Sequence, residues 1–341
     1  MTALTIDDLQ GDRKRSRREA AVSRLFKTAA AFSIVISALI VISLFREAFL
    51  YLTGIKLDWP VHLQGDAPFI GFRPEFWIQT GNGVEISQLW TSGWFPRRGL
   101  FDVKTLLVAS VGTTAVAMLL AMPIGVGTAV YLSEYASPTV RRIVKPVIEV
   151  LAGIPSVVLG FFALAWIAPN IVDRLFDPTS SANLLVAGLG VGILTIPLVA
   201  SISEDALQSV PISLREASYG VGAKKVQTVT RVVIPAALSG LVAAFIVAVS
   251  RAIGETLVVT IAAGGSGGAV FPESFPSPEI VTEPGLTMTA AMATLAAGSD
   301  QVVGQGNAFQ SLFFVGLLLF VLTFLLNVAA GRIVRRFRQV Y

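Results

Sequence analysis

The sequence predicts an all-α membrane protein with six transmembrane helices, and three observations lead to this fold class. The chain of 341 residues is 54% apolar and 14% charged, whereas about a quarter of the residues in soluble domains are charged. Its mean hydropathy is +0.72. Long apolar stretches recur along the chain, and basic residues cluster beside them. A polytopic membrane protein is therefore expected.

Six apolar stretches reach the length of about 20 residues that a membrane-crossing helix needs. Helices are expected because every backbone polar group in lipid must be satisfied within the protein. The first stretch follows a basic segment but is not followed by a small-residue cleavage site, so it is expected to be an uncleaved helix. The expected spans are 28–45, 103–131, 146–168, 183–201, 235–262 and 310–329.

Basic residues predict which side of the membrane each connection faces. The segment 1–27 is rich in Arg and Lys, arginines follow the last span, and 263–309 contains neither Lys nor Arg. Because basic segments beside spans stay in the cytoplasm, both termini are expected there. The predicted organisation is a basic cytoplasmic tail at 1–27 and one transmembrane domain at 28–341, with external loops at 46–102 and 263–309 and a cytoplasmic region at 202–231.

The composition disfavours several kinds of chemistry. The chain has no cysteine, and its one histidine, His62, has no second histidine with which to share a metal. No G-x-x-x-x-G-K-[ST] motif occurs, so ATP binding through a P-loop is not expected. A membrane enzyme lacks support because no His, Cys or acidic cluster lies within the spans. No cofactor is expected, and no nucleic-acid partner, because the basic tail abuts a span and has no aromatic platform.

Glycines and prolines within the spans predict local packing. The GLGVG stretch sits in the middle of a span with no strand before it, so Gly188 and Gly192 are expected to form a close helix-packing face. Pro123, Pro155 and Pro197 are expected to kink their spans, either to help packing or beside a wet cavity.

The two external segments differ in composition. The first carries four tryptophans, which suit a membrane interface or a packed external cap. The second contains GGSGG and the proline-rich FPESFPSPE, which predict a flexible surface loop. The four tryptophans are Trp59, Trp77, Trp90 and Trp94.

A polar insert between the fourth and fifth spans predicts a compact helix-turn-helix. Ser213 and Glu216 have the spacing of a capping box, with Pro211 just outside the predicted helix. Gly222 then supplies a turn because glycine adopts positive φ readily. A second short helix follows and runs into Pro235 and the fifth span.

The insert resembles the coupling motif of ATP-binding-cassette (ABC) importer permeases, in which an EAA triplet, a glycine and an I-x-L-P-like close occur at fixed spacing. Here Glu216, Ala217 and Ser218 stand for the triplet, Gly222 is the glycine, and VVIP closes the motif. The resemblance implies the type I ABC importer permease fold. It also implies that the short helix docks into a groove on a separate ATPase subunit; the alternative is that Glu216 only caps its helix.

Four further stretches resemble the phosphate-specific importer permeases: YLSEYA, LAGIPSVVLGFFAL, ISEDAL and RAIGET. Two of them, GIPSVVLGFFAL and ISEDAL, are more similar to the PstC-type subunit than to its PstA-type partner. The resemblance implies a prokaryotic inner-membrane, multi-pass protein. Its expected partners are a homologous PstA-type permease, a PstB-type ATPase dimer, a PstS-type external binding protein, phosphate and membrane lipid.

Arg251 and Glu255 are charged residues in an otherwise apolar run. Arg251 lies about 24 Å along a continuous helix from Pro235, slightly beyond the middle of a bilayer core about 30 Å thick. At four residues apart on one helix, the two side chains are expected to share a face. In one interpretation they form a structural ion pair. In the other, which the resemblance supports, Arg251 lines the translocation path and donates to phosphate oxygens while Glu255 orients it.

Three alternatives remain open. The chain could be the PstA-type partner subunit, or a permease for another oxyanion. A second, distinct permease encoded in the same genomic neighbourhood would separate these interpretations. A non-transporting membrane scaffold or receptor is an alternative of another class, and it predicts that Arg251 and Glu255 are dispensable. Glu255 could also accept a hydrogen bond from the proton that phosphate retains at neutral pH, which would disfavour sulfate.

Overall fold

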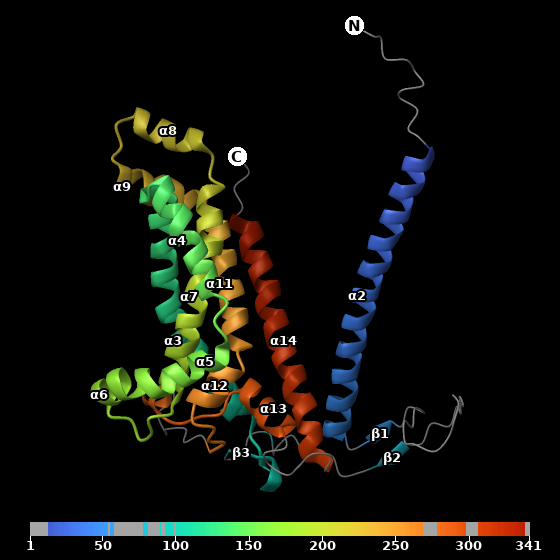
Figure 1. Cartoon of the computed structure of the whole chain (residues 1–341). Coiled ribbons are helices and arrows are strands. Elements are labelled where there is room, and N and C mark those ends of the chain that lie inside the picture. The colour runs from blue at the N-terminus through green and yellow to red at the C-terminus, as the bar shows by residue number, and fades with distance from the viewer. Residues whose placement is uncertain are drawn as a thin grey trace.

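A computed structural model of the chain describes residues 13–53, 55–57, 78–80, 89, 93–98, 100–268, 278–297 and 306–337 (Figure 1). Five helical segments in these residues are long and apolar enough to cross a membrane, and a bent pair of helices supplies a sixth candidate. The predicted all-α membrane fold is confirmed. The five segments are Glu19–Thr53, Val103–Tyr135, Ser156–Phe176, Leu184–Gln208 and Ala308–Ile333.

The first helix is much longer than predicted. Helix α2 (Arg13–Thr53) begins within the basic segment expected as a tail, so part of that segment is helical. It packs against α14 (Gly306–Phe337) near its C-terminal end, and its other end stands apart from the remaining helices (Figure 1). Residues 1–12 lie outside the described residues.

Helices α3 (Val103–Val130) and α7 (Leu184–Gln208) form the centre of the bundle. A Cβ added to Gly188 would lie 2.6 Å from the Val116 Cβ, and one added to Gly192 would lie 3.1 Å from the Ala117 carbonyl oxygen. Side chains at these positions would therefore push the helices apart. The predicted glycine packing face is confirmed.

The predicted third span, 146–168, is wrong in its boundaries. Helix α4 (Pro138–Leu151) has no buried residue, and it ends before Pro155, which stands at the start of α5 (Ser156–Phe162). Proline lacks a backbone N–H and disfavours helical geometry at the preceding residue, so the helix stops there. The span-length apolar segment instead runs from α5 through a π-helix, η4 (Ala163–Val172), into α6 (Asp173–Phe176).

The predicted fifth span, 235–262, is also not continuous. The segment Lys225–Ala236 meets α11 (Leu238–Ile253) at an angle of 68°. This segment consists of α9 (Lys225–Thr228), a π-helix η5 (Val229–Val233) and α10 (Ile234–Ala236). After α11 a second interruption precedes α12 (Leu257–Ala262).

The sequence predicted that 263–309 is a flexible external loop, but its described part is largely structured. A 3-10 helix, η6 (Pro278–Thr282), is followed by α13 (Met288–Ala296), and every residue from Gly285 to Ala291 is buried. The Leu184 N–H donates to the Glu283 carbonyl oxygen at 3.2 Å, and the Met288 N–H donates to Ser110 Oγ at 2.9 Å. Most of FPESFPSPE lies outside the described residues.

Two short antiparallel strand pairs lie at the same end of the molecule as α13 (Figure 1). They are β1 (Ile55–Leu57) with β2 (Ile78–Thr80), and β3 (Trp94–Phe95) with β4 (Leu100–Phe101), a short 3-10 helix η2 (Pro96–Arg98) separating the last two. Trp94 is buried and packs edge-on against Phe101, which contacts Tyr51 of α2 in the same way. Trp94 thus belongs to a packed cap. Trp59, Trp77 and Trp90, like His62, lie outside the described residues.

Candidate functional site

The short helix α8 (Ile212–Gly220) projects beyond the ends of α3 and α7 (Figure 1). It starts directly after Pro211, and Ser213 lies inside it rather than at its cap. The predicted capping box of Ser213 and Glu216 is therefore wrong, because no side chain caps this helix. Its start coincides with the proline, which already has a φ of −56°.

The predicted turn at Gly222 is confirmed. Its φ is +81°, a conformation that favours glycine. The Gly222 N–H donates to the Tyr219 carbonyl oxygen at 2.9 Å, and the Ala223 N–H donates to the Ser218 carbonyl oxygen at 3.2 Å. These two bonds form a Schellman motif, which ends α8 and turns the chain toward α9.

The two faces of α8 differ in what they contact. Leu214 packs against a small core below the helix, whose members are Ala129, Leu207, Val210, Val233, Ala237 and Leu241. On the outer side, Glu216, Ala217 and Gly222 are exposed. Ile212 is 70% exposed and Val221 85% exposed. The outer side of α8 and its following turn therefore leaves two large apolar side chains uncovered beside the exposed Glu216.

One ion pair and two hydrogen bonds from a single arginine join α8 to the bundle. The Arg215 guanidinium donates to Glu134 Oε1 at 2.9 Å, to the Leu207 carbonyl oxygen at 2.9 Å and to the Val210 carbonyl oxygen at 2.5 Å. Glu134 belongs to η3 (Tyr131–Tyr135), the π-helical extension of α3. We refer to α8 with the turn after it, η3, α4 and the C-terminal end of α7 as the α8 end.

A second cluster at the α8 end surrounds Glu204, which is only 1% exposed. Its carboxylate accepts from Arg141 Nε at 2.8 Å and from Gln208 Nε2 at 2.7 Å, and Lys145 Nζ lies 3.3 Å away. Partial burial acts to lower the pKa of Lys145, but hydrogen bonds and charge from Asp205 and Glu204 outweigh it and raise the pKa above the ordinary lysine value. The cluster ties α4 to α7.

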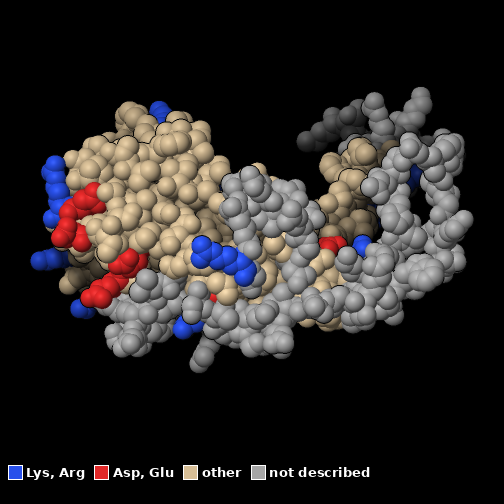
Figure 2. All heavy atoms as spheres, turned by 90° about the horizontal axis from the view of Figure 1, so that it is seen from below, with Lys and Arg blue, Asp and Glu red and all other residues tan. Residues whose placement is uncertain are grey.

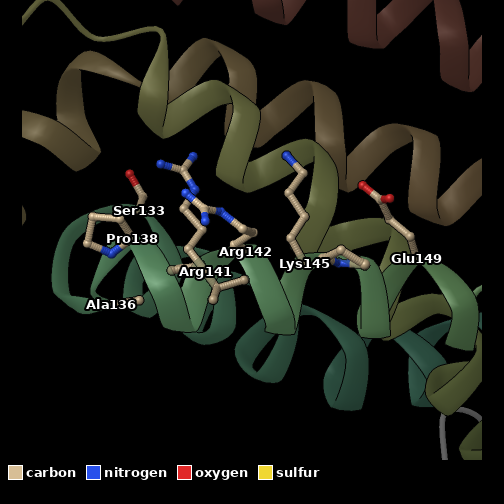
Figure 3. Close-up of a pocket in the computed structure, with 9 residues that line it drawn as sticks. Ser133, Ala136, Pro138, Arg141, Arg142, Lys145 and Glu149 are labelled. Carbon is tan, nitrogen blue, oxygen red and sulfur yellow. The ribbon is translucent and has the colours of Figure 1, made fainter.

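A hollow of about 460 Å³ lies between α4 and the end of α3, beside the second cluster. Arg141, Arg142, Lys145 and Glu149 project from the same side of α4 (Figure 3). Arg142 is exposed and makes no ion pair within the part of the chain that the structure describes. The lining residues are Leu132, Ser133, Ala136, Pro138, Arg141, Arg142, Lys145, Pro146 and Glu149.

The prediction that Arg251 and Glu255 share the face of one helix is wrong. Helix α11 ends at Ile253, and Gly254 to Thr256 separate it from α12; we call this interruption, together with the last turn of α11 that carries Arg251, the helix break. Thr289 Oγ1 of α13 donates to the Glu255 carbonyl oxygen at 2.7 Å, so a backbone group released by the break is satisfied from another helix. No ion pair joins Arg251 to Glu255.

The charged side chains at the helix break have no polar partner within the described chain. Arg251 is exposed and Glu255 is partly exposed, and neither side chain makes a hydrogen bond or ion pair with any described residue. A Cβ added to Gly254 would meet only the preceding turn of α11. A charged side chain is costly in lipid, so Arg251 needs a water-filled path or another subunit beside it.

Sequence reasoning missed the ion pairs of the α8 end. Glu134 lies in YLSEYA and Glu204 in ISEDAL, so each acid occupies a recognisable stretch at the end of an apolar helix. Their partners were not predictable from spacing, because Arg215 is 81 residues from Glu134 and Arg141 is 63 residues from Glu204.

Comparison with known proteins gives one family match and many similar chains. Residues 121–339 match the model of the family described as binding-protein-dependent transport system inner membrane component. A probable ABC transporter permease protein YqgH of Bacillus subtilis is 34% identical over 249 residues, covering 72% of this chain and 76% of that protein. A phosphate transport system permease protein PstC of Mesorhizobium japonicum is 32% identical and covers 73% and 78%.

A third relative is a phosphate transport system permease protein PstC 1 of Mycobacterium tuberculosis, 31% identical, covering 71% of this chain and 74% of that protein. Among solved structures, a bacterial ABC transporter involved in the import of the acidic polysaccharide alginate aligns with a TM-score of 0.50 at 12% identity. That alignment covers 74% of this chain and 87% of the other, and at this identity it concerns the fold alone.

Proposed function

The chain belongs to the family of binding-protein-dependent transport system inner membrane components, and we propose that it is the PstC-type permease subunit of an ATP-driven phosphate importer. The predicted class, an ABC importer permease, is confirmed by the family match over residues 121–339. The predicted importer permease fold agrees with the solved structure that aligns with this chain. The substrate and the partner subunits belong to the proposal.

The two-faced helix α8 is the observation that carries the proposal. Its inner side is held by Leu214 and Arg215, while its outer side presents Glu216 and apolar side chains to solvent. A short rigid helix of this kind suits a groove on a partner protein. Because the chain contains no P-loop motif, a separate PstB-type ATPase dimer would supply the energy by docking here.

Arg251 would line the translocation path, where this subunit meets a homologous PstA-type permease. Its side chain is exposed and unpaired within the described chain, so its guanidinium fork is available to phosphate oxygens. Glu255, in the helix break, would accept the hydrogen bond of a protonated phosphate and disfavour sulfate. Interrupted helices at a substrate site recur in transporters because they expose backbone groups and change direction within the membrane.

We orient the α8 end toward the cytoplasm of a prokaryotic cell and α13 toward the outside, where a PstS-type protein would deliver phosphate. The α8 end carries the basic residues of α4 and of the turn after α8, which fits the positive-inside rule. Seen from the opposite end, most of the described surface is uncharged, with the largest group of charged side chains at one edge and a few others in the middle and toward the far side (Figure 2). Both termini would then be cytoplasmic.

A PstA-type subunit or a permease for another oxyanion is the nearest alternative, and a non-transporting scaffold is a more distant one. The test is to purify the chain with its co-expressed partners and to measure uptake into proteoliposomes that contain ATP. The proposal expects an ATPase and a second permease to co-purify, and radiolabelled phosphate to enter in an ATP-dependent way that unlabelled sulfate does not inhibit. ATP-dependent sulfate uptake without phosphate uptake would contradict the substrate.

A further inference from the structure

We propose that Arg215 is a positioning residue that joins α8 to the ends of α3 and α7, so that a displacement of α8 moves both helices together. The inference rests on the proposed function, because it concerns how the movement of a docked ATPase reaches the translocation path. It adds a residue outside the EAA triplet to the coupling machinery.

The geometry of Arg215 brings three elements together through one side chain. Its guanidinium donates to the Glu134 carboxylate in η3 and to two carbonyl oxygens, those of Leu207 and Val210, at the end of α7. The last carbonyl groups of a helix lack partners within it. The Leu207 carbonyl also accepts from the Val210 N–H at 3.4 Å, and the arginine adds a charged donor to it and to the Val210 carbonyl just beyond the helix. The same guanidinium group therefore bonds to the C-terminal end of α7 and to the extension of α3.

The pair is enclosed rather than solvated. The side chain of Glu134 is 6% exposed and that of Arg215 is 17% exposed. An exposed ion pair contributes little and changes partners readily, whereas a buried pair with fixed geometry leaves an uncompensated charge when one member is removed. The Arg215–Glu134 contact is thus suited to hold α8 in one orientation relative to the bundle.

The other attachments of α8 fix its direction less strictly. Leu214 packs on apolar residues, and Ser218 shares a hydrogen bond of 2.9 Å with Thr228 of α9. Apolar packing tolerates sliding, but a charge-assisted contact to several acceptors depends on direction. Arg215 is therefore the contact that sets the angle between α8 and the bundle.

The helices that Arg215 reaches form a rigid pair. A Cβ on Gly125 of α3 would lie 2.7 Å from the Val199 Cβ of α7, and the Gly188 and Gly192 contacts extend the same close packing along α7. Interiors packed this closely transmit displacement rather than absorb it. Helix α11, which carries Arg251, packs against both α3 and α7, so the pair connects α8 to the helix break.

The first test uses Arg215→Gln and Glu134→Gln in the complete transporter. In proteoliposomes we expect the amount of phosphate transported per ATP hydrolysed to fall at least tenfold, while the ATPase still co-purifies because the outer side of α8 is unchanged. For Arg215→Lys, the amount of phosphate transported per ATP hydrolysed should lie between that of these variants and that of the wild type. The matched control is Arg332→Gln, an exposed arginine of α14 without a hydrogen bond or ion pair among the described residues. An unchanged ratio in an assembled Arg215→Gln complex would overturn the inference.

A second test remains decisive if those variants assemble poorly. The chain has no cysteine, so the double variant Glu134→Cys with Arg215→Cys can be joined by a short bifunctional thiol reagent. We expect the cross-linked complex to regain coupled uptake that the untreated double variant lacks, and each single cysteine variant to be unaffected by the reagent. Equal uptake with and without the cross-link would contradict the positioning role. Absence of phosphate uptake by the wild-type complex would instead contradict the proposed function.

Discussion

At the α8 end, the buried carboxylates of Glu134 and Glu204 are each paired with arginine from another element of the same chain. At the helix break, Arg251 and Glu255 have no side-chain partner among the described residues. The charged groups of the α8 end therefore find their partners within this subunit, whereas those of the helix break do not. We infer that the α8 end is a preassembled connector, and that the helix break is completed by a second permease and by the substrate.

The comparison predicts that changing the exposed side of α8 abolishes docking without disturbing the subunit. Glu216→Lys reverses a charge that has no ion pair within the described residues, so membrane insertion and thermal stability should be unchanged. Co-purification of the ATPase and phosphate uptake should both be lost. The control is Glu149→Lys, the same reversal at an exposed position of α4, which should retain the ATPase. Full uptake by Glu216→Lys would argue against docking on this face.

Changing the paired carboxylate should act on stability instead. Glu204→Gln leaves Arg141 and Lys145 without their buried countercharge. Breaking a fully buried pair costs about 3–5 kcal/mol, and because these two partners are partly exposed we expect about 2 kcal/mol. Thermal unfolding of the purified subunit in detergent measures this change. Asp205→Asn, at a side chain that is 67% exposed, should differ from the wild type by less than about 0.5 kcal/mol.

A smaller effect distinguishes Gly220, the last residue of α8, from Gly222 in the turn that follows it. An added Cβ meets nothing within 4 Å at either Gly220 or Gly222, but only Gly222 has a positive φ. Gly222→Ala should therefore destabilise the turn by about 1 kcal/mol, whereas Gly220→Ala should stabilise the helix by up to about 1 kcal/mol. Amide hydrogen exchange across residues 218–223 should accelerate several-fold in the first variant and slow in the second. Equal exchange in both would contradict the role of the Schellman turn.

The sequence predicted the features that depend on local chemistry. Long apolar runs predicted membrane spans, of which five helices and one bent pair are found among the described residues, Gly222 predicted a turn, and Gly188 with Gly192 predicted a packing face. The capping box failed because the spacing of Ser213 and Glu216 matched the motif, while the helix begins two residues earlier than a cap at Ser213 would place it, directly after Pro211. A local motif was present, but the neighbouring proline decided the outcome.

The features that the sequence did not predict depend on contacts between distant segments. The helix break lies in an apolar run that reads as a continuous helix, and the hydrogen bond that satisfies it comes from Thr289, 34 residues later. The start of α13 is likewise bonded to Ser110, which is 178 residues from Met288. Contacts between residues so far apart in the chain follow no repeating pattern that a single sequence reveals.

The central claim is that Arg251 is unpaired in this subunit because it serves the translocation path. The most direct test is uptake of radiolabelled phosphate by complexes carrying Arg251→Gln, alone and combined with Glu255→Gln. Since no ion pair joins the two residues, we predict normal assembly of both variants and a loss of uptake of at least a hundredfold in each, with Arg332→Gln unchanged. Wild-type uptake by the double variant at equal expression would contradict the account.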